Sequence, residues 1–137
     1  MADTKYGKYI SRESYKVGSN PEVAQPMVHL DGMKHAAGEN LTLSRSWITV
    51  PFTMIKAPHT HEFHQFLVYS GGNPLDVTEF GAEIELSLGE EGEKHIINTP
   101  AIVHIPPGLF HGPMSFVRID KPIEFLDIVL APEYIRK

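Results

Sequence analysis

The chain has 137 residues, of which 42% are hydrophobic and 21% are charged, and its formal net charge is −5 at pH 7. This length and composition are typical of one soluble globular domain. There is no basic stripe, which argues against nucleic acid as a partner, and no apolar run approaches the roughly 20 residues that would cross a membrane. The chain has no cysteine, so a bound metal ion would need nitrogen and oxygen donors.

Residues 1–40 are polar and irregular in pattern. Gly18-Ser19-Asn20-Pro21 predicts a turn, and further Pro and Gly residues break the pattern between positions 26 and 38. We expect an arm that lies on the domain or across a partner subunit, with His29 and His35 solvated or packed within it. The N-terminus has no secretory signal, so we expect a cytoplasmic protein.

Short strands are predicted from residue 41 onward, because apolar and β-branched runs alternate with Gly and Pro turns. The predicted strands cover residues 41–50, 52–55, 58–69, 79–88, 95–98, 101–105, 116–119 and 123–130. About seven to nine short strands, with no long helix, predict an all-β sandwich or barrel. The absence of an internal repeat indicates a single domain of this kind.

The predicted strand at residues 58–69 begins with the histidine-rich run PHTHEFHQF. Side chains alternate along a strand, so His59, His61 and Gln65 are expected to share one face. Two imidazoles two residues apart can bind one transition metal ion. A solvated surface cluster is the alternative interpretation. Glu62 or His64 could replace Gln65 only if the strand were irregular.

A second motif lies downstream, where Pro106-Pro107-Gly108 predicts a tight turn just before His111. Together the two stretches resemble the paired metal-binding motifs of the cupin family. The matching positions are His59, His61, Gly72, Pro106, Gly108 and His111, and Gln65 stands where the family usually has Glu. The departures are Thr53 and Pro100 in place of two opening glycines, and Ser115 in place of a closing Asn.

The resemblance implies an all-β fold, an antiparallel jelly-roll (cupin-type) β-barrel with an irregular N-terminal arm. The arm would be residues 1–40, the barrel residues 41–131 and a C-terminal tail residues 132–137. The resemblance also implies a ligand set for one divalent transition metal ion. Those ligands would be His59, His61, Gln65 and His111. Iron, nickel, zinc, manganese and copper all suit such donors.

A neutral Gln ligand leaves a metal ion more positive than Glu would, which favours polarising a carbonyl or acidifying bound water. We therefore expect a metalloenzyme of the dioxygenase, isomerase or lyase type that acts on a small polar or oxygenated substrate. The alternatives are a non-enzymatic cupin that binds a small sugar-like ligand, and an inactive protein that has kept its ligands. A homodimer formed through sheet edges or arm exchange is also expected.

Two further features leave alternatives open. Glu83 and Glu85 alternate with apolar residues, which is typical of a solvated outer face, although either carboxylate could line the barrel mouth as a base. His104 interrupts an apolar strand. It is interpreted as a histidine of the barrel wall or surface, or alternatively as a pocket residue near the metal.

Overall fold

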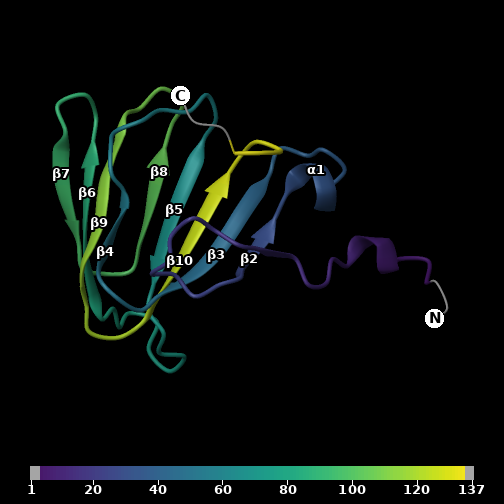
Figure 1. Cartoon of the computed structure of the whole chain (residues 1–137), viewed down its shortest axis with the longest axis horizontal. Coiled ribbons are helices and arrows are strands. Elements are labelled where there is room, and N and C mark those ends of the chain that lie inside the picture. The colour runs from purple at the N-terminus through teal and green to yellow at the C-terminus, as the bar shows by residue number, and fades with distance from the viewer. Residues whose placement is uncertain (1–3, 135–137) are drawn as a thin grey trace.

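The computed structural model describes residues 4–134, which form two antiparallel β-sheets (Figure 1). The strands are β1 (Tyr15–Lys16), β2 (Met27–Leu30), β3 (Thr42–Ile48), β4 (Phe52–Ile55), β5 (Gln65–Ser70), β6 (Ala82–Leu88), β7 (Glu93–Ile97), β8 (Ala101–Ile105), β9 (His111–Ile119) and β10 (Ile123–Val129). One sheet has six strands in the order β1-β2-β3-β10-β5-β8, and the other has four in the order β4-β9-β6-β7. The predicted all-β antiparallel architecture is confirmed.

The two sheets pack face to face but are not closed into one continuous ladder of hydrogen bonds. Alternation along the strands supplies the core: Ala82, Ile84 and Leu86 of β6 are buried, whereas the residues between them are half exposed. Phe116 of β9 meets Phe125 of β10 edge to face, with ring centroids 5.9 Å apart. Apolar burial between the sheets therefore holds them together.

The N-terminal region contributes more regular structure than the sequence pattern indicates. β2 pairs with β3, and β1 pairs in turn with β2, so both extend the six-stranded sheet. A four-residue helix, α1 (Gly32–His35), comes after β2 and is capped by the Asp31 side chain. The domain boundary expected after residue 40 stays a prediction, and residues 1–3 and 135–137 of the expected arm and tail lie outside the described residues.

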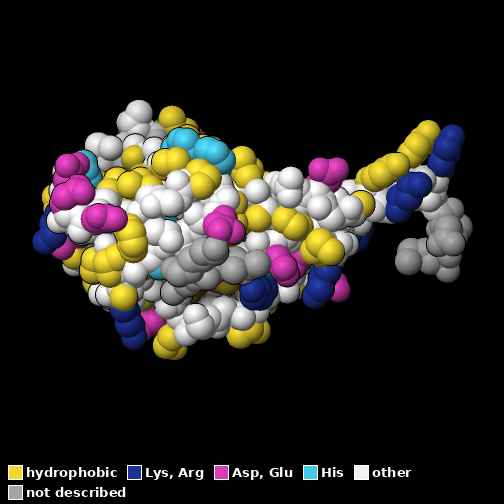
Figure 2. Space-filling view, turned by 90° about the horizontal axis from the view of Figure 1, so that it is seen from above, with side chains coloured by type: hydrophobic (Ala, Val, Ile, Leu, Met, Phe, Trp, Pro, Cys, Tyr) yellow, Lys and Arg dark blue, Asp and Glu magenta, His cyan; other side chains and the backbone are white. Residues whose placement is uncertain are grey.

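Before β1 the chain projects away from the body of the molecule (Figure 2). This segment holds a short 3-10 helix (Gly7–Tyr9) in which no residue is buried. Tyr6 and Tyr9 expose 63% and 74% of their surface. Among residues 4–134, no helix is both long enough and apolar enough to span a bilayer.

Gly112 allows β9 to pass close to the segment that comes after β4. Its φ is +109°, a backbone conformation that side-chain-bearing residues rarely adopt. A Cβ atom at this position would lie 2.7 Å from a methyl carbon of Ile55 and 3.0 Å from the carbonyl oxygen of Ala57. Glycine is therefore required where β9 brings His111 beside the histidine-rich loop.

Candidate metal centre

His59 and His111 are joined through their backbones, although they lie far apart in the sequence. The N–H group of each donates to the carbonyl oxygen of the other, at 3.1 Å in both directions. The N–H of Gly108 also donates to the carbonyl of His61, at 2.9 Å. These three bonds place the turn before β9 against the loop between β4 and β5, and so bring the two sequence motifs together.

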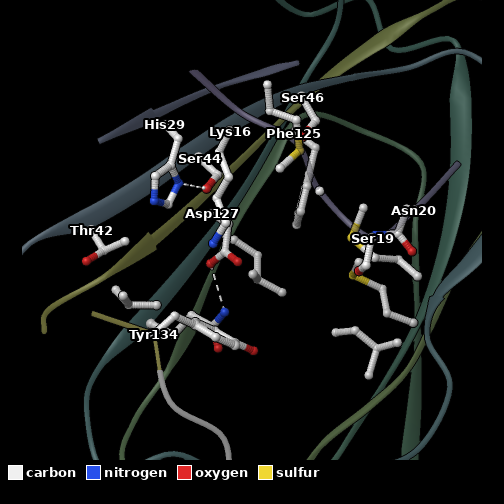
Figure 3. Close-up of a pocket in the computed structure, with 18 residues that line it drawn as sticks. Lys16, Ser19, Asn20, His29, Thr42, Ser44, Ser46, Phe125, Asp127 and Tyr134 are labelled. Atoms are coloured by element: carbon white, nitrogen blue, oxygen red, sulfur yellow. Dashed lines mark hydrogen bonds between the residues drawn. The ribbon is translucent and has the colours of Figure 1, made fainter. Parts of the chain in front are cut away.

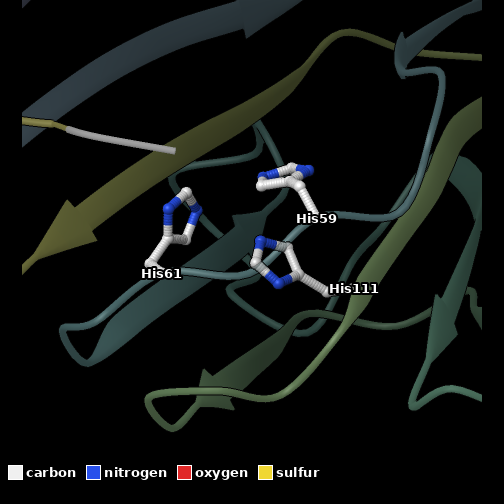
Figure 4. Close-up of side chains that lie close together, drawn as sticks. All are labelled: His59, His61 and His111. Atoms are coloured by element: carbon white, nitrogen blue, oxygen red, sulfur yellow. The ribbon is translucent and has the colours of Figure 1, made fainter. Parts of the chain in front are cut away.

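The imidazole rings of His59, His61 and His111 face one another in a buried cluster (Figure 4). One ring nitrogen from each lies within 4.8 Å of the others, and ring centroids are 4.3–5.0 Å apart. The three residues are only 7%, 3% and 0% exposed. Three converging buried imidazoles are compatible with one divalent transition metal ion.

Backbone carbonyls fix which ring nitrogens face the centre of the cluster. His111 Nδ1 lies 3.1 Å from the carbonyl oxygen of Leu109, and His59 Nδ1 lies 3.4 Å from that of Ala57. A carbonyl oxygen only accepts, so each Nδ1 carries the proton and each Nε2 keeps its lone pair. This outer hydrogen bonding is typical of histidines that bind a metal through Nε2.

Gln65 begins β5 and is only 2% exposed. Its amide Nε2 donates to Oδ1 of Asp127 on β10, at 2.8 Å. A carboxylate only accepts, so this bond determines which end of the amide is the oxygen. The buried Oε1 has no hydrogen-bond partner among the described residues. A buried oxygen of this kind fits the fourth ligand of a metal site, because desolvation without a partner is costly.

Tyr134 brings a further oxygen to the cluster from the C-terminal segment. Its hydroxyl lies 3.2 Å from Nε2 of His61 and 3.5 Å from Nε2 of His59, the nitrogen that faces the cluster. Its ring also meets the His61 ring edge to face, with centroids 4.9 Å apart. The expected tail therefore reaches the candidate site through this residue.

No protein-family model matches the sequence, and no curated protein matches it. Solved structures do match. Bacillus subtilis oxalate decarboxylase, which has Mn(II) centres, aligns with a TM-score of 0.56 and 14% identity over 87% of this chain and 28% of its own. Oxalate oxidase bound to the substrate analogue glycolate aligns with a TM-score of 0.58 and 13% identity over 95% of this chain and 63% of its own. The chain has the cupin fold.

Within this cupin fold, one strand prediction is wrong. β5 begins only at Gln65, so His59 and His61 lie in the preceding loop rather than on the same strand. The backbone of His59 pairs with that of His111 in an isolated bridge, so the residues around His59 do not join a strand of either sheet. Loop geometry, not strand alternation, therefore brings the imidazoles together. The assignment of His59, His61, Gln65 and His111 as metal ligands stays a prediction.

The other candidate side chains are more exposed than the three clustered histidines. Glu62 and His64 are exposed, and His64 instead contacts the exposed His104, with ring nitrogens 2.8 Å apart. Glu83 and Glu85 are half exposed on β6. They form ion pairs with Arg118 and Lys94 respectively. These contacts agree with the solvated-face interpretation of the carboxylates and the surface interpretation of His104.

A cavity of about 240 Å³ adjoins the cluster, and its lining includes Gln65, Asp127 and Tyr134 (Figure 3). Lys16 and His29, which belong to the expected N-terminal arm, also line it. Burial lowers the pKa of the His29 imidazole, and the neighbouring Lys16 ammonium lowers it further. The N-terminal strands therefore form part of the cavity beside the histidine cluster.

Proposed function

We propose that the protein is a metal-dependent enzyme that acts on a small oxygenated substrate bound in this cavity. The observation that carries the proposal is the buried cluster of three imidazoles. The buried Oε1 of Gln65, which has no hydrogen-bond partner among residues 4–134, supports it. His59, His61, Gln65 and His111 would hold one divalent transition metal ion. The structural neighbours named above, oxalate decarboxylase and oxalate oxidase, support an enzyme rather than a non-enzymatic cupin.

The four ligands are all neutral, and this determines the chemistry that they favour. A divalent ion held by them would polarise a carbonyl oxygen or acidify bound water. Asp127 holds the Gln65 amide so that its oxygen, not its nitrogen, is directed away from the carboxylate. The carbonyls of Ala57 and Leu109 hold two imidazoles in the tautomer that leaves Nε2 available.

Burial of the site next to a cavity favours chemistry on a bound ligand. The imidazoles are almost fully enclosed, and the adjoining cavity offers space for a ligand within reach of the Tyr134 hydroxyl. Low dielectric surroundings strengthen charge interactions with a bound substrate. Dioxygenase, isomerase and lyase reactions are all compatible with this arrangement, and a non-enzymatic cupin that binds a small sugar-like ligand is the alternative.

Metal analysis tests the proposal directly. The protein purified without a metal-affinity tag is expected to contain about one transition metal ion per chain, since the site has one set of ligands. His111→Ala should lose that metal, whereas His95→Ala, which removes an exposed imidazole from β7, should keep it. Equal metal content in both variants would show that the cluster is not the site.

The identity of the metal then directs the activity screen. Iron or copper would direct it to oxygen consumption, and zinc or nickel to isomerase and lyase reactions. A protein that holds its metal but turns over no member of a panel of oxygenated substrates would favour the ligand-binding alternative.

We also propose a homodimer in which the projecting segment packs on a second copy. Its aromatic side chains are exposed in the single chain, and burying them against a partner would stabilise the assembly. Removing residues 1–12 should then convert a dimer to a monomer in light scattering, and an unchanged molar mass per particle would count against arm exchange. The cytoplasmic location stays a prediction.

A further inference from the structure

Tyr134 is held beside the histidine cluster by the segment that comes after β10. In this segment the N–H of Leu130 donates to the carbonyl oxygen of His64, at 2.9 Å. The hydroxyl of Thr42, the first residue of β3, donates to the carbonyl oxygen of Ala131, at 2.8 Å. These bonds fix the chain to the six-stranded sheet just before it reaches the cluster, so the position of Tyr134 depends on the sheet.

The ring of Tyr134 packs on aromatic side chains of the loop between β4 and β5. It meets His61 edge to face, with centroids 4.9 Å apart, and its centroid lies 6.0 Å from that of Phe63. Phe63 in turn stacks on His61, at 4.7 Å. Aromatic pairs at these separations attract one another. The three rings therefore stabilise an orientation in which the Tyr134 hydroxyl reaches the imidazole nitrogens.

The hydroxyl oxygen of Tyr134 has the spacing of a further metal ligand. It lies 3.2 Å from Nε2 of His61 and 3.5 Å from Nε2 of His59. Two donors that bind one ion at about 2.1 Å, with an angle of about 90–110° between them, lie about 3.0–3.4 Å apart. A hydrogen bond between nitrogen and oxygen is usually no longer than about 3.2 Å. One shared ion therefore accounts for the two contacts better than a pair of hydrogen bonds.

A phenolate would also supply the negative charge that the proposed ligand set lacks. No Asp or Glu among residues 4–134 joins the three histidines in the cluster, and the Gln65 amide is neutral. Asp127 bonds to that amide and is not a member of the cluster. Four neutral ligands would leave a divalent ion with its full charge in a buried site, which is costly. An anionic oxygen donor from Tyr134 would halve that charge.

We propose that the phenol oxygen of Tyr134 is a fifth protein ligand of the metal ion, beside the three imidazoles and the Gln65 amide. Tyr134 would bind as phenolate, and its proton would pass to solvent when the metal binds. The inference rests on the proposed function, because it adds a ligand to that metal site. An octahedral ion would then keep one position for a substrate, and Tyr134 also lines the cavity from which a substrate would approach.

Visible absorption of the metal-loaded protein tests this ligand without any activity assay. A phenolate bound to Cu(II) or Fe(III) gives a ligand-to-metal charge-transfer band in the visible range, which neutral imidazole and amide donors do not give. The full chain, treated with chelator, would be loaded with one equivalent of Cu(II) or, separately, of Fe(III). The wild type is expected to hold the metal by elemental analysis and to show the band.

Two tyrosine variants assign the band. Tyr134→Phe removes only the hydroxyl and keeps the ring that packs on His61 and Phe63. It should hold metal through the other four ligands, lose the band, and bind Zn(II) about tenfold more weakly than the wild type. Tyr15→Phe is the matched control, because it removes the same hydroxyl from a residue of β1 that is 60% exposed. The control should keep the band.

The metal content separates failure of this inference from failure of the proposed function. A wild type that holds about one metal ion per chain but shows no visible band with either ion would overturn the inference and leave the metal site in place. A band that survives in Tyr134→Phe would do the same. A wild type that takes up neither ion would refute the metal site and its fifth ligand together. A band that is lost in Tyr134→Phe and kept in Tyr15→Phe would support the inference, whichever reaction the protein catalyses.

Discussion

Asp127→Asn tests whether the carboxylate on β10 orients Gln65, the proposed metal ligand on β5. Asp127 can only accept a hydrogen bond, so it holds the Gln65 amide in one orientation through the 2.8 Å contact. An Asn side chain offers both a donor and an acceptor, so the Gln65 amide could turn its NH₂ group toward the histidines. Loss of an outer hydrogen bond of this kind typically weakens metal binding about 10- to 100-fold, or about 1.4 to 2.7 kcal/mol.

The assay is competition with a chromophoric chelator, which gives the metal dissociation constant of each variant. Asp120→Asn is the matched control, because it removes the same charge from an exposed position that pairs with Arg118. The control should bind metal within about twofold of the wild type, as expected for an exposed ion pair. If Asp127→Asn also stays within that range, Gln65 is not oriented by Asp127 or is not a ligand.

Three further outcomes are expected from chelator-treated protein. Gly112→Ala should lower the free energy of unfolding in urea by about 1–3 kcal/mol, because the new methyl group adds steric strain to the backbone strain. Gly92→Ala is the control, because its backbone φ is also positive but the space around it is open. It should lower the same free energy by only about 1 kcal/mol. Gln65→Glu should cost about 1–3 kcal/mol in the same assay, because a second acceptor would replace the group that donates to Asp127. Because His29 has a lowered pKa, the unfolded chain takes up the proton first as the pH falls below about 6.5, and stability decreases. His29→Gln should lose less stability than the wild type between about pH 7 and pH 5, and identical losses would contradict the assigned burial of this imidazole.

The strands could be predicted because their signal is local. Alternation within residues 82–88 and 123–129 is visible in the sequence, and both segments form strands with one buried face. The histidine loop could not be predicted in this way. Its conformation depends on backbone bonds between His59 and His111, which lie on segments that meet only in the folded chain.

The three histidines of the candidate site could be predicted from the sequence, but the residues that surround them could not. Asp127 did leave a signal, because it shares strand parity with the buried Phe125 and Val129, and a carboxylate on a buried face indicates a specific partner. Tyr134 and Lys16 left none. Their positions at the cluster and the cavity depend on long-range packing of the two chain ends, which local pattern does not encode.

The histidine cluster lies where the loop between β4 and β5 passes from one sheet to the other. Gln65 belongs to the six-stranded sheet, His111 begins a strand of the four-stranded sheet, and the loop with His59 connects one sheet to the other. An ion bound by residues from both sheets would link the two sheets to each other. Ligand binding to the folded state alone raises stability with ligand concentration. If the cluster binds a metal ion in the folded state alone, the free energy of unfolding of this protein should therefore rise with the concentration of that metal.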